Sequence, residues 1–206
     1  MSRRDLAARL DQVIEFLKKV GVTNVIIGCN AASTAIPDLA DHSIPVEGVI
    51  EPAIRLAARI TPARLGVIGG RRTITSGAYR KALAARGIQV KQRIAQPLSA
   101  LIESGDVDSN DLRSAAERIL RPLRHSSHIM LACTHYPAIT PLLQQLVSPE
   151  TRFIDPASEM IEIIRKWRLP LAGGDVFLTS GDAESMSTSA AKAFGVSISK
   201  AEKISI

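Results

Sequence analysis

The regular alternation of short apolar segments with longer amphipathic ones most strongly constrains how this chain can fold. Uncharged runs rich in apolar residues, typical of buried strands, occupy residues 23–28, 65–70 and 128–132. Segments whose apolar residues recur every three or four positions, typical of helices, occupy residues 6–20 and 109–123. Short strands that alternate with amphipathic helices predict an α/β fold with mainly parallel sheets.

The same pattern continues along the rest of the chain. We expect residues 31–39 to form a short helix or a loop. Further strands are expected at 46–50, at 87–90 with an extension towards 94, at 152–154 and at 176–179. Further helices are expected at 51–60, 75–85, 137–146, 157–167 and 183–194.

Composition excludes several classes of protein. With 46% hydrophobic and 22% charged residues in 206, the chain is neither disordered nor fibrous. Its longest apolar runs are far shorter than the roughly 20 residues that span a bilayer. The first residues lead into a charged amphipathic segment and not into an apolar signal region, so we expect a cytoplasmic protein. The net charge of +6 suggests nucleic acid, but scattered basic residues and 3% aromatics argue against that partner.

The two cysteines occupy similar positions in two similar segments. Cys29 follows Val-Ile-Ile-Gly and Cys133 follows Ile-Met-Leu-Ala, and each is followed by a small hydrogen-bonding residue. Each cysteine therefore lies at the carboxyl end of a buried strand, where ligands bind in parallel sheets. Chance similarity between two apolar strands is the alternative to two related units that face each other across a cleft.

Two thiols on opposite walls of a cleft suit one particular reaction. One thiolate removes a proton from a carbon atom, and the other thiol returns a proton to the opposite face, which inverts the carbon. His135 is close enough in sequence to assist Cys133. Hydrogen bonds to a substrate carboxylate could come from Asn30, Ser33, Thr34 and Thr134.

Other chemistries remain open at these residues. Cys133 and His135 could be half of a zinc site, but the chain has no partner Cys-x-x-Cys or His pair. Either cysteine could instead be a lone covalent nucleophile with His135 as its base. Gly69 and Gly70 are interpreted as a tight turn, because the Lys-Ser/Thr of a phosphate-binding loop is absent. The other three histidines, His42, His125 and His128, are interpreted as packing or solvated residues.

Six segments, in the right order along nearly the whole chain, resemble the glutamate racemases of the aspartate/glutamate racemase superfamily. The most specific are residues 27–33, which contain Cys29, and residues 131–137, which contain Cys133. The others are residues 44–53, 66–79, 153–156 and 177–182.

The resemblance implies an architecture and a set of site residues. It implies two pseudo-symmetric α/β lobes with the active site between them, one formed by residues 1–56 plus 162–206 and the other by 57–161. It implies that Cys29 and Cys133 are the two acid/base thiols and that His135 supports Cys133. Glu103 matches an acidic position linked to catalysis, although the sequence alone favours a solvated loop glutamate. Asn30 and Thr134 would bind substrate, Ala31 occupies a third binding position of the motif, and Ser33 and Thr34 are further candidates.

The resemblance also implies a reaction. It is the cofactor-independent interconversion of L- and D-glutamate, which supplies D-glutamate for peptidoglycan synthesis. Within the superfamily, aspartate or hydantoin racemases are alternatives, and a non-catalytic racemase scaffold is another. The sequence leaves the oligomeric state open, a homodimer being common in the family.

This sequence departs from the family pattern in three places. Ala31 stands where the first motif usually has threonine, so one substrate hydrogen bond would be lost, and Gly70 replaces a further threonine. The family pattern also begins earlier, with a strand ending in Asp-Ser-Gly, a helix and a Pro-Tyr-Gly loop. We therefore expect an incomplete first lobe, owing to a start codon assigned too late, to degradation or to a changed role.

Overall fold

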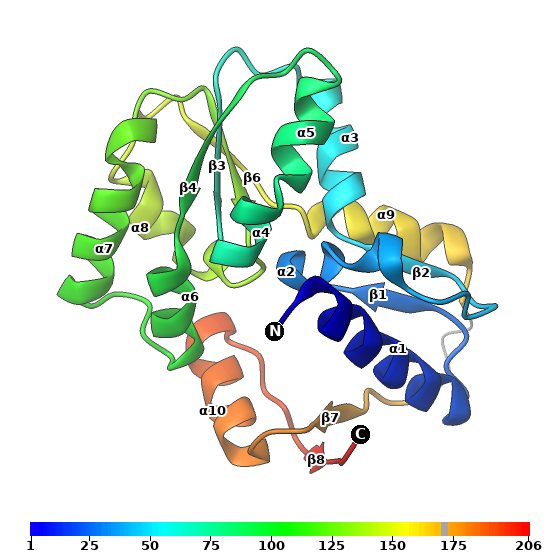
Figure 1. Cartoon of the computed structure of the whole chain (residues 1–206). Helices are drawn as coiled ribbons and strands as arrows, with labels where there is room; N and C mark the ends of the chain where they lie inside the picture. Colours follow the sequence, from blue (N-terminus) through cyan, green and yellow to red (C-terminus); the bar gives the residue numbers. More distant parts are fainter. Residues whose placement is uncertain (170–172) are drawn as a thin grey trace.

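Three parallel sheets form the framework of the computed structural model, which describes residues 1–169 and 173–206. The largest sheet has the strand order β4 (Val90–Ile94), β3 (Leu65–Gly69), β5 (His128–Ala132) and β6 (Arg152–Ile154). The others pair β1 (Val25–Ile27) with β2 (Val46–Gly48) and β7 (Phe177–Thr179) with β8 (Ala201–Lys203). Every pair is parallel, which confirms the predicted fold class (Figure 1).

Helices surround these sheets. The short helical turns are 3₁₀ segments at Ile36–Asp38, Arg121–Leu123 and Tyr136–Ile139. The α-helices are α1 (Arg3–Lys19), α2 (Asn30–Ser33), α3 (Ile50–Ile60), α4 (Arg71–Ser76), α5 (Ala78–Ala84), α6 (Gln96–Glu103), α7 (Asn110–Leu120), α8 (Thr140–Gln144), α9 (Ser158–Trp167) and α10 (Ala183–Phe194).

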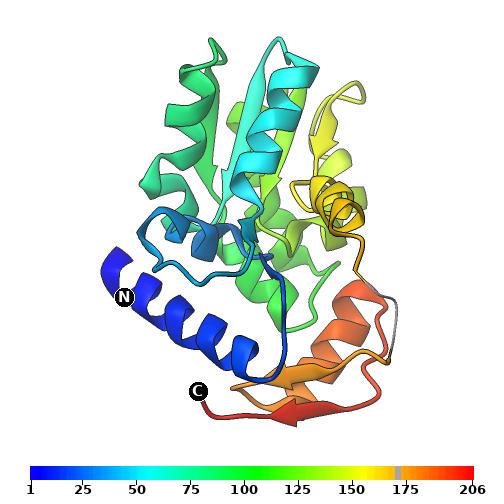
Figure 2. The same cartoon turned by 90° about the vertical axis from the view of Figure 1, so that its right-hand side faces the viewer.

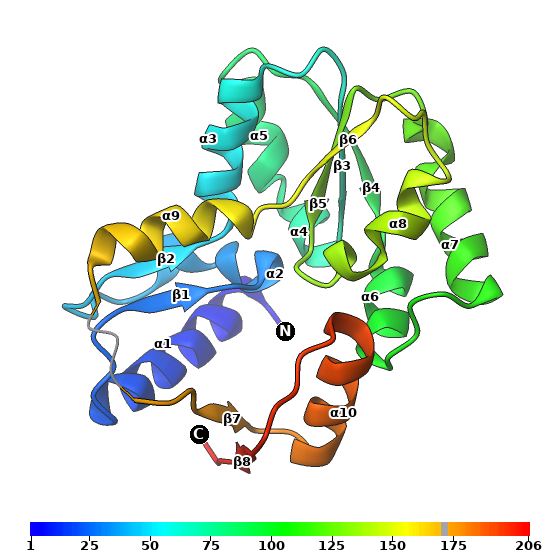
Figure 3. The same cartoon turned by 180° about the vertical axis from the view of Figure 1, so that it is seen from behind.

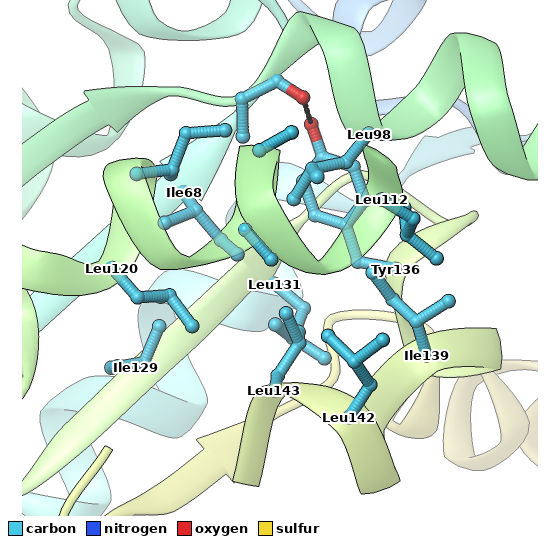
Figure 4. Close-up of a cluster of buried hydrophobic side chains, with 14 of the residues drawn as sticks. Ile68, Leu98, Leu112, Leu120, Ile129, Leu131, Tyr136, Ile139, Leu142 and Leu143 are labelled. Atoms are coloured by element: carbon cyan, nitrogen blue, oxygen red, sulfur yellow. Dashed lines mark hydrogen bonds between the residues drawn. The ribbon is translucent and has the colours of Figure 1, made fainter. Parts of the chain in front are cut away.

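Both faces of the four-stranded sheet are covered by helices. Side chains alternate along β3 and β5, so Val67 and Met130 point to one face while Ile68 and Leu131 point to the other. The first face packs against α3 and α5. The second face packs against α6, α7 and α8, and Figure 4 shows the side chains of this cluster. Sheets buried on both faces require continuous apolar strands, which explains the uninterrupted apolar runs in the sequence.

The chain ends form the rest of the molecule. Helix α1 lies along β1 and β2, where Ile14 packs against Val25 and Ile27 (Figure 2). After α9, the chain continues past β7 to α10, which packs against α6 and brings Ala193 onto the core of the larger sheet (Figure 3). No helix in residues 1–169 or 173–206 is both long and apolar enough to cross a membrane.

The structure corrects two expected elements and adds two. The helix predicted at 75–85 is two helices, because Gly77 adopts a left-handed φ of +71° that ends α4 and begins α5. The strand expected from 87 begins at Val90, because Gly87 has a φ of +74° and still caps α5. Two elements were not predicted at all, namely α6 and β8.

His42 is neither solvated nor an inert packing residue. The residue is 4% exposed, and its ring lies between two carboxylates of α1, with Nε2 2.7 Å from Asp11 Oδ1 and Nδ1 2.9 Å from Glu15 Oε1. Since a neutral imidazole carries only one N–H, both bonds require the imidazolium form. Burial lowers the pKa of His42, but the hydrogen bonds to Glu15 and Asp11 outweigh burial and raise the pKa above its usual value.

We predict that this contact makes α1 docking pH-dependent. The pKa of His42 is higher in the folded state than its value of 6.5 in the unfolded chain, so the protonated ring stabilises the fold. This stabilisation is complete at pH values below 6.5 and is lost as the pH rises through the pKa of the folded state. The variant His42→Gln should therefore lower Tm more at about pH 6 than at about pH 9. Thermal unfolding of both proteins at each pH measures this, and an equal loss at both would contradict it.

Candidate active site

The order of the four strands creates a switch point between β3 and β5. From β3 the chain crosses to β4 on one side and later to β5 on the other, so the loops that leave β3 and β5 diverge. Gly69 pairs with Ala132 at the last register position, which places Cys133 at the carboxyl end of the sheet. Glycine fits closely there, because a Cβ atom at this position would lie 3.1 Å from the Ala132 carbonyl oxygen, a tight contact that would require a small shift of the neighbouring strand.

Cys29 is positioned by the corresponding junction of the smaller sheet. It follows β1 and caps the first turn of α2 with an extended backbone, and its carbonyl oxygen accepts a hydrogen bond from the Ser33 amide. Helix α2 lies beside the carboxyl end of the four-stranded sheet in Figures 1 and 3. Cys29 is exposed and Cys133 is half-buried, and neither forms a disulfide.

The electrostatics of Cys133 show which groups surround it. Burial raises the pKa of the Cys133 thiol, and the negative charges of Cys29 and Glu103 raise it further. Hydrogen bonds from the His135 backbone and the Ser99 side chain act in the opposite direction but do not cancel the rise. Cys29 and Glu103 act on the charge of this thiol only because both side chains lie near it, so the three residues belong to one candidate site.

His135 lies directly beside the second thiol. Its Nδ1 atom is 3.4 Å from Cys133 Sγ, within hydrogen-bond range of a sulfur atom. Helix α10 lies next to His135, since the His135 and Phe194 rings have centroids 6.3 Å apart. The C-terminal segment therefore forms part of the wall of the site, a role that the sequence did not indicate for Phe194.

Glu103 is the last residue of α6 and not part of a loop. Its side chain is exposed, while Leu98, Ser99 and Ile102 of the same helix are buried. The apolar face of α6 packs on the core of the larger sheet, which places the end of the helix near Cys133. Packing of this helix therefore positions the carboxylate.

Asn30 has the most unusual environment among the predicted binding residues. It is 2% exposed, and its Oδ1 atom accepts a hydrogen bond of 2.6 Å from the Tyr79 hydroxyl. Its Nδ2 atom is buried and has no hydrogen-bond partner among the described residues. Sequence reasoning did not single out Tyr79, because nothing in its position within α5 indicates that it reaches α2.

Two of the remaining predicted binding residues already use their hydroxyl protons in local hydrogen bonds. The Ser33 hydroxyl donates to the Ile27 carbonyl oxygen, and the Thr34 hydroxyl donates to the Ala31 carbonyl oxygen, so both hydroxyl protons are engaged in local structure. Ala31 and Thr134 are half-buried next to Asn30 and Cys133, respectively. Within the described part of the chain, no group of three His, Cys, Asp or Glu side chains could hold a metal ion.

Comparison with known proteins identifies the family. The sequence profile of the family described as Asp/Glu/Hydantoin racemase matches residues 1–164. A glutamate racemase of Synechococcus sp. is 39% identical over 152 residues, which are 71% of this chain and 56% of that protein. A glutamate racemase of Carboxydothermus hydrogenoformans is 32% identical and matches all of this chain and 81% of that protein. The chain thus spans little more than half the length of the first relative.

Solved structures share the fold. The glutamate racemase of Thermus thermophilus, solved with beta-chloro-D-alanine, matches with a TM-score of 0.86 and 28% identity over all of this chain and 81% of that chain. The RacE1 isoform of glutamate racemase from Bacillus anthracis matches with a TM-score of 0.85 and 26% identity, over all of this chain and 82% of that chain. From the profile match and these relatives, this chain belongs to the Asp/Glu/hydantoin racemase family.

Proposed function

We propose that this protein is a glutamate racemase that interconverts L- and D-glutamate by proton transfer between two thiols. The observation that carries the proposal is the convergence of Cys29 and Cys133 from two different sheets on one site. The product D-glutamate would serve peptidoglycan synthesis, as the relatedness to glutamate racemases suggests, and we propose that the enzyme acts in the cytoplasm.

The geometry supports a two-base reaction. One thiolate would remove the α-proton from one face of the amino acid, and the other thiol would give a proton to the opposite face. The raised pKa of Cys133 keeps this thiol protonated near neutral pH, so that it holds the proton to be donated. His135 Nδ1, 3.4 Å from Cys133 Sγ, is placed to exchange a proton with the thiol between turnovers.

The site offers hydrogen-bond donors for a carboxylate. The buried Nδ2 group of Asn30 has no partner among the described residues, and Thr134 lies between Cys133 and His135. An unpaired buried donor is costly unless a ligand uses it. We propose that Asn30 and Thr134 bind the substrate, and that Ser33 and Thr34 shape the turn around Cys29. We also retain the two-lobe division at 1–56 plus 162–206 and 57–161 as a proposal; residues 170–172 lie outside the described part.

Removal of either thiol should abolish turnover. The variants Cys29→Ala and Cys133→Ala each lose one of the two groups that exchange protons with the α-carbon. We expect the racemisation rate in either direction to fall by at least about 10²-fold. Polarimetry or circular dichroism of L- and D-glutamate solutions measures the rate.

Thermal unfolding of both variants is the control for folding. The Cys29 side chain is exposed, so Cys29→Ala should unfold at the wild-type temperature. Turnover near the wild-type rate in either folded variant would exclude the two-thiol reaction.

Glu103→Gln should change the pH dependence of the reaction. Its carboxylate raises the pKa of Cys133, so neutralising it lowers that pKa and shifts the thiol-dependent limb of the rate profile to lower pH. A thiolate of lower pKa is also a weaker base, so the maximal rate should fall, but by less than in the thiol variants. A kcat/KM profile against pH measures both effects. An unshifted profile with an unchanged rate would show that Glu103 is only a solvated surface residue.

A further inference from the structure

The hydroxyl of Tyr79 forms an isolated polar contact inside an apolar core. Its ring is fully buried with Val67, Leu83 and Met130 beneath α3 and α5. From that core the hydroxyl reaches Asn30 in the first turn of α2, at 2.6 Å from Oδ1. Among the described residues, this is the only hydrogen bond between two side chains for which both partners are buried. It ties the core of the larger sheet to the residue that follows Cys29.

The hydrogen bond determines which end of the Asn30 amide is free. With the phenolic proton donated to Oδ1, the amide oxygen and the hydroxyl are both satisfied, and the Nδ2 group is left without a partner. If the amide were rotated by 180°, Nδ2 would donate to the hydroxyl oxygen, and the phenolic proton would then lack an acceptor. The observed orientation therefore leaves two N–H donors free, and the reversed one would present an acceptor.

Tyr79 keeps the proton that this orientation requires. Burial raises the pKa of the Tyr79 phenol strongly, and the negative charge of Asp155 raises it further. The phenol is therefore neutral near physiological pH and can donate its proton to Asn30. The hydrogen bond to Asn30 is a fixed feature and not one that titrates with the catalytic thiols.

We propose that Tyr79 is a positioning residue, which holds the Asn30 side chain so that its Nδ2 group donates to a carboxylate of the amino-acid substrate. This inference rests on the function proposed above and extends it to a residue in the core of the other sheet. Tyr79 touches no reacting atom, and it acts only through Asn30. An amide free to turn would spend part of its time with Oδ1 towards the substrate, where oxygen and carboxylate repel each other.

The test is the variant Tyr79→Phe, which removes the hydroxyl and keeps the ring. Asn30 would contact the carboxylate equally in the ground state and in the transition state, so its loss should raise KM and leave kcat nearly unchanged. We expect KM for L-glutamate to rise about tenfold, with a much smaller change in kcat. In an Asn30→Ala background, Tyr79→Phe should have no further effect on KM, because the residue through which it acts is gone.

Thr151→Val is the matched control. The Thr151 side chain is also buried, and its hydroxyl donates to the Ser126 carbonyl oxygen at 2.8 Å, just before β6 begins and so at the amino end of the sheet. This variant loses one partly buried hydrogen bond far from the site and should lower Tm without raising KM. An unchanged KM in Tyr79→Phe would overturn the proposal. A KM rise of the same size in Thr151→Val or in the Asn30→Ala background would overturn it as well.

A second measurement separates this inference from the proposed reaction. The Nδ2 resonances of Asn30 in ¹⁵N-labelled protein are assigned by their loss in Asn30→Ala. We expect L-glutamate to shift these resonances in the wild type and to shift them less at the same concentration in Tyr79→Phe. If the wild type binds L-glutamate in this way but does not racemise it, the proposed reaction fails while the role of Tyr79 stands. Equal shifts in both proteins would overturn the role of Tyr79.

Discussion

Burial of the β4-β3-β5-β6 sheet on both faces is the constraint on which the rest of the structure depends. Helices α3 and α5 cover one face and α6, α7 and α8 cover the other, so the central strands β3 and β5 are buried and a ligand can approach them only at their ends. At the carboxyl end, the chain diverges between β3 and β5, and Cys133 lies there. The opposite wall of the candidate site comes from the smaller sheet, where Cys29 and Asn30 lie at the start of α2.

The fold was largely predictable because buried parallel strands require continuous apolar runs. Residues 65–70 and 128–132 could be assigned as strands for this reason, and the structure confirms them. Helix breaks were harder to predict, because Gly77 is compatible with a helix interior at modest cost and ends α4 only through its left-handed conformation. Helix α6 was missed although Leu98, Leu101 and Ile102 have helical spacing, because eight residues give only this one repeat.

The candidate site was predictable where chemistry is local to a strand end. Cys29, Cys133 and His135 follow apolar strands directly, and the structure places them together. Contributions that depend on tertiary packing could not be predicted. Glu103 reaches the site only because α6 packs on the core of the larger sheet. Tyr79 reaches Asn30 only because α5, which covers the larger sheet, lies close to α2, which follows β1 of the smaller sheet. The ion pairs of His42 with α1 likewise join residues about thirty positions apart in sequence.

The most direct test of the account is the fate of the α-proton in D₂O. The protein is incubated separately with L- and D-glutamate, and deuterium at the α-carbon of both enantiomers is followed by NMR and mass spectrometry at low conversion. Two thiols on opposite faces predict that the newly formed enantiomer contains deuterium while the remaining substrate contains almost none, in both directions. Deuterium in the remaining substrate at the same rate as in the product would show that one base serves both faces. The absence of exchange in the folded protein would contradict the racemase function itself.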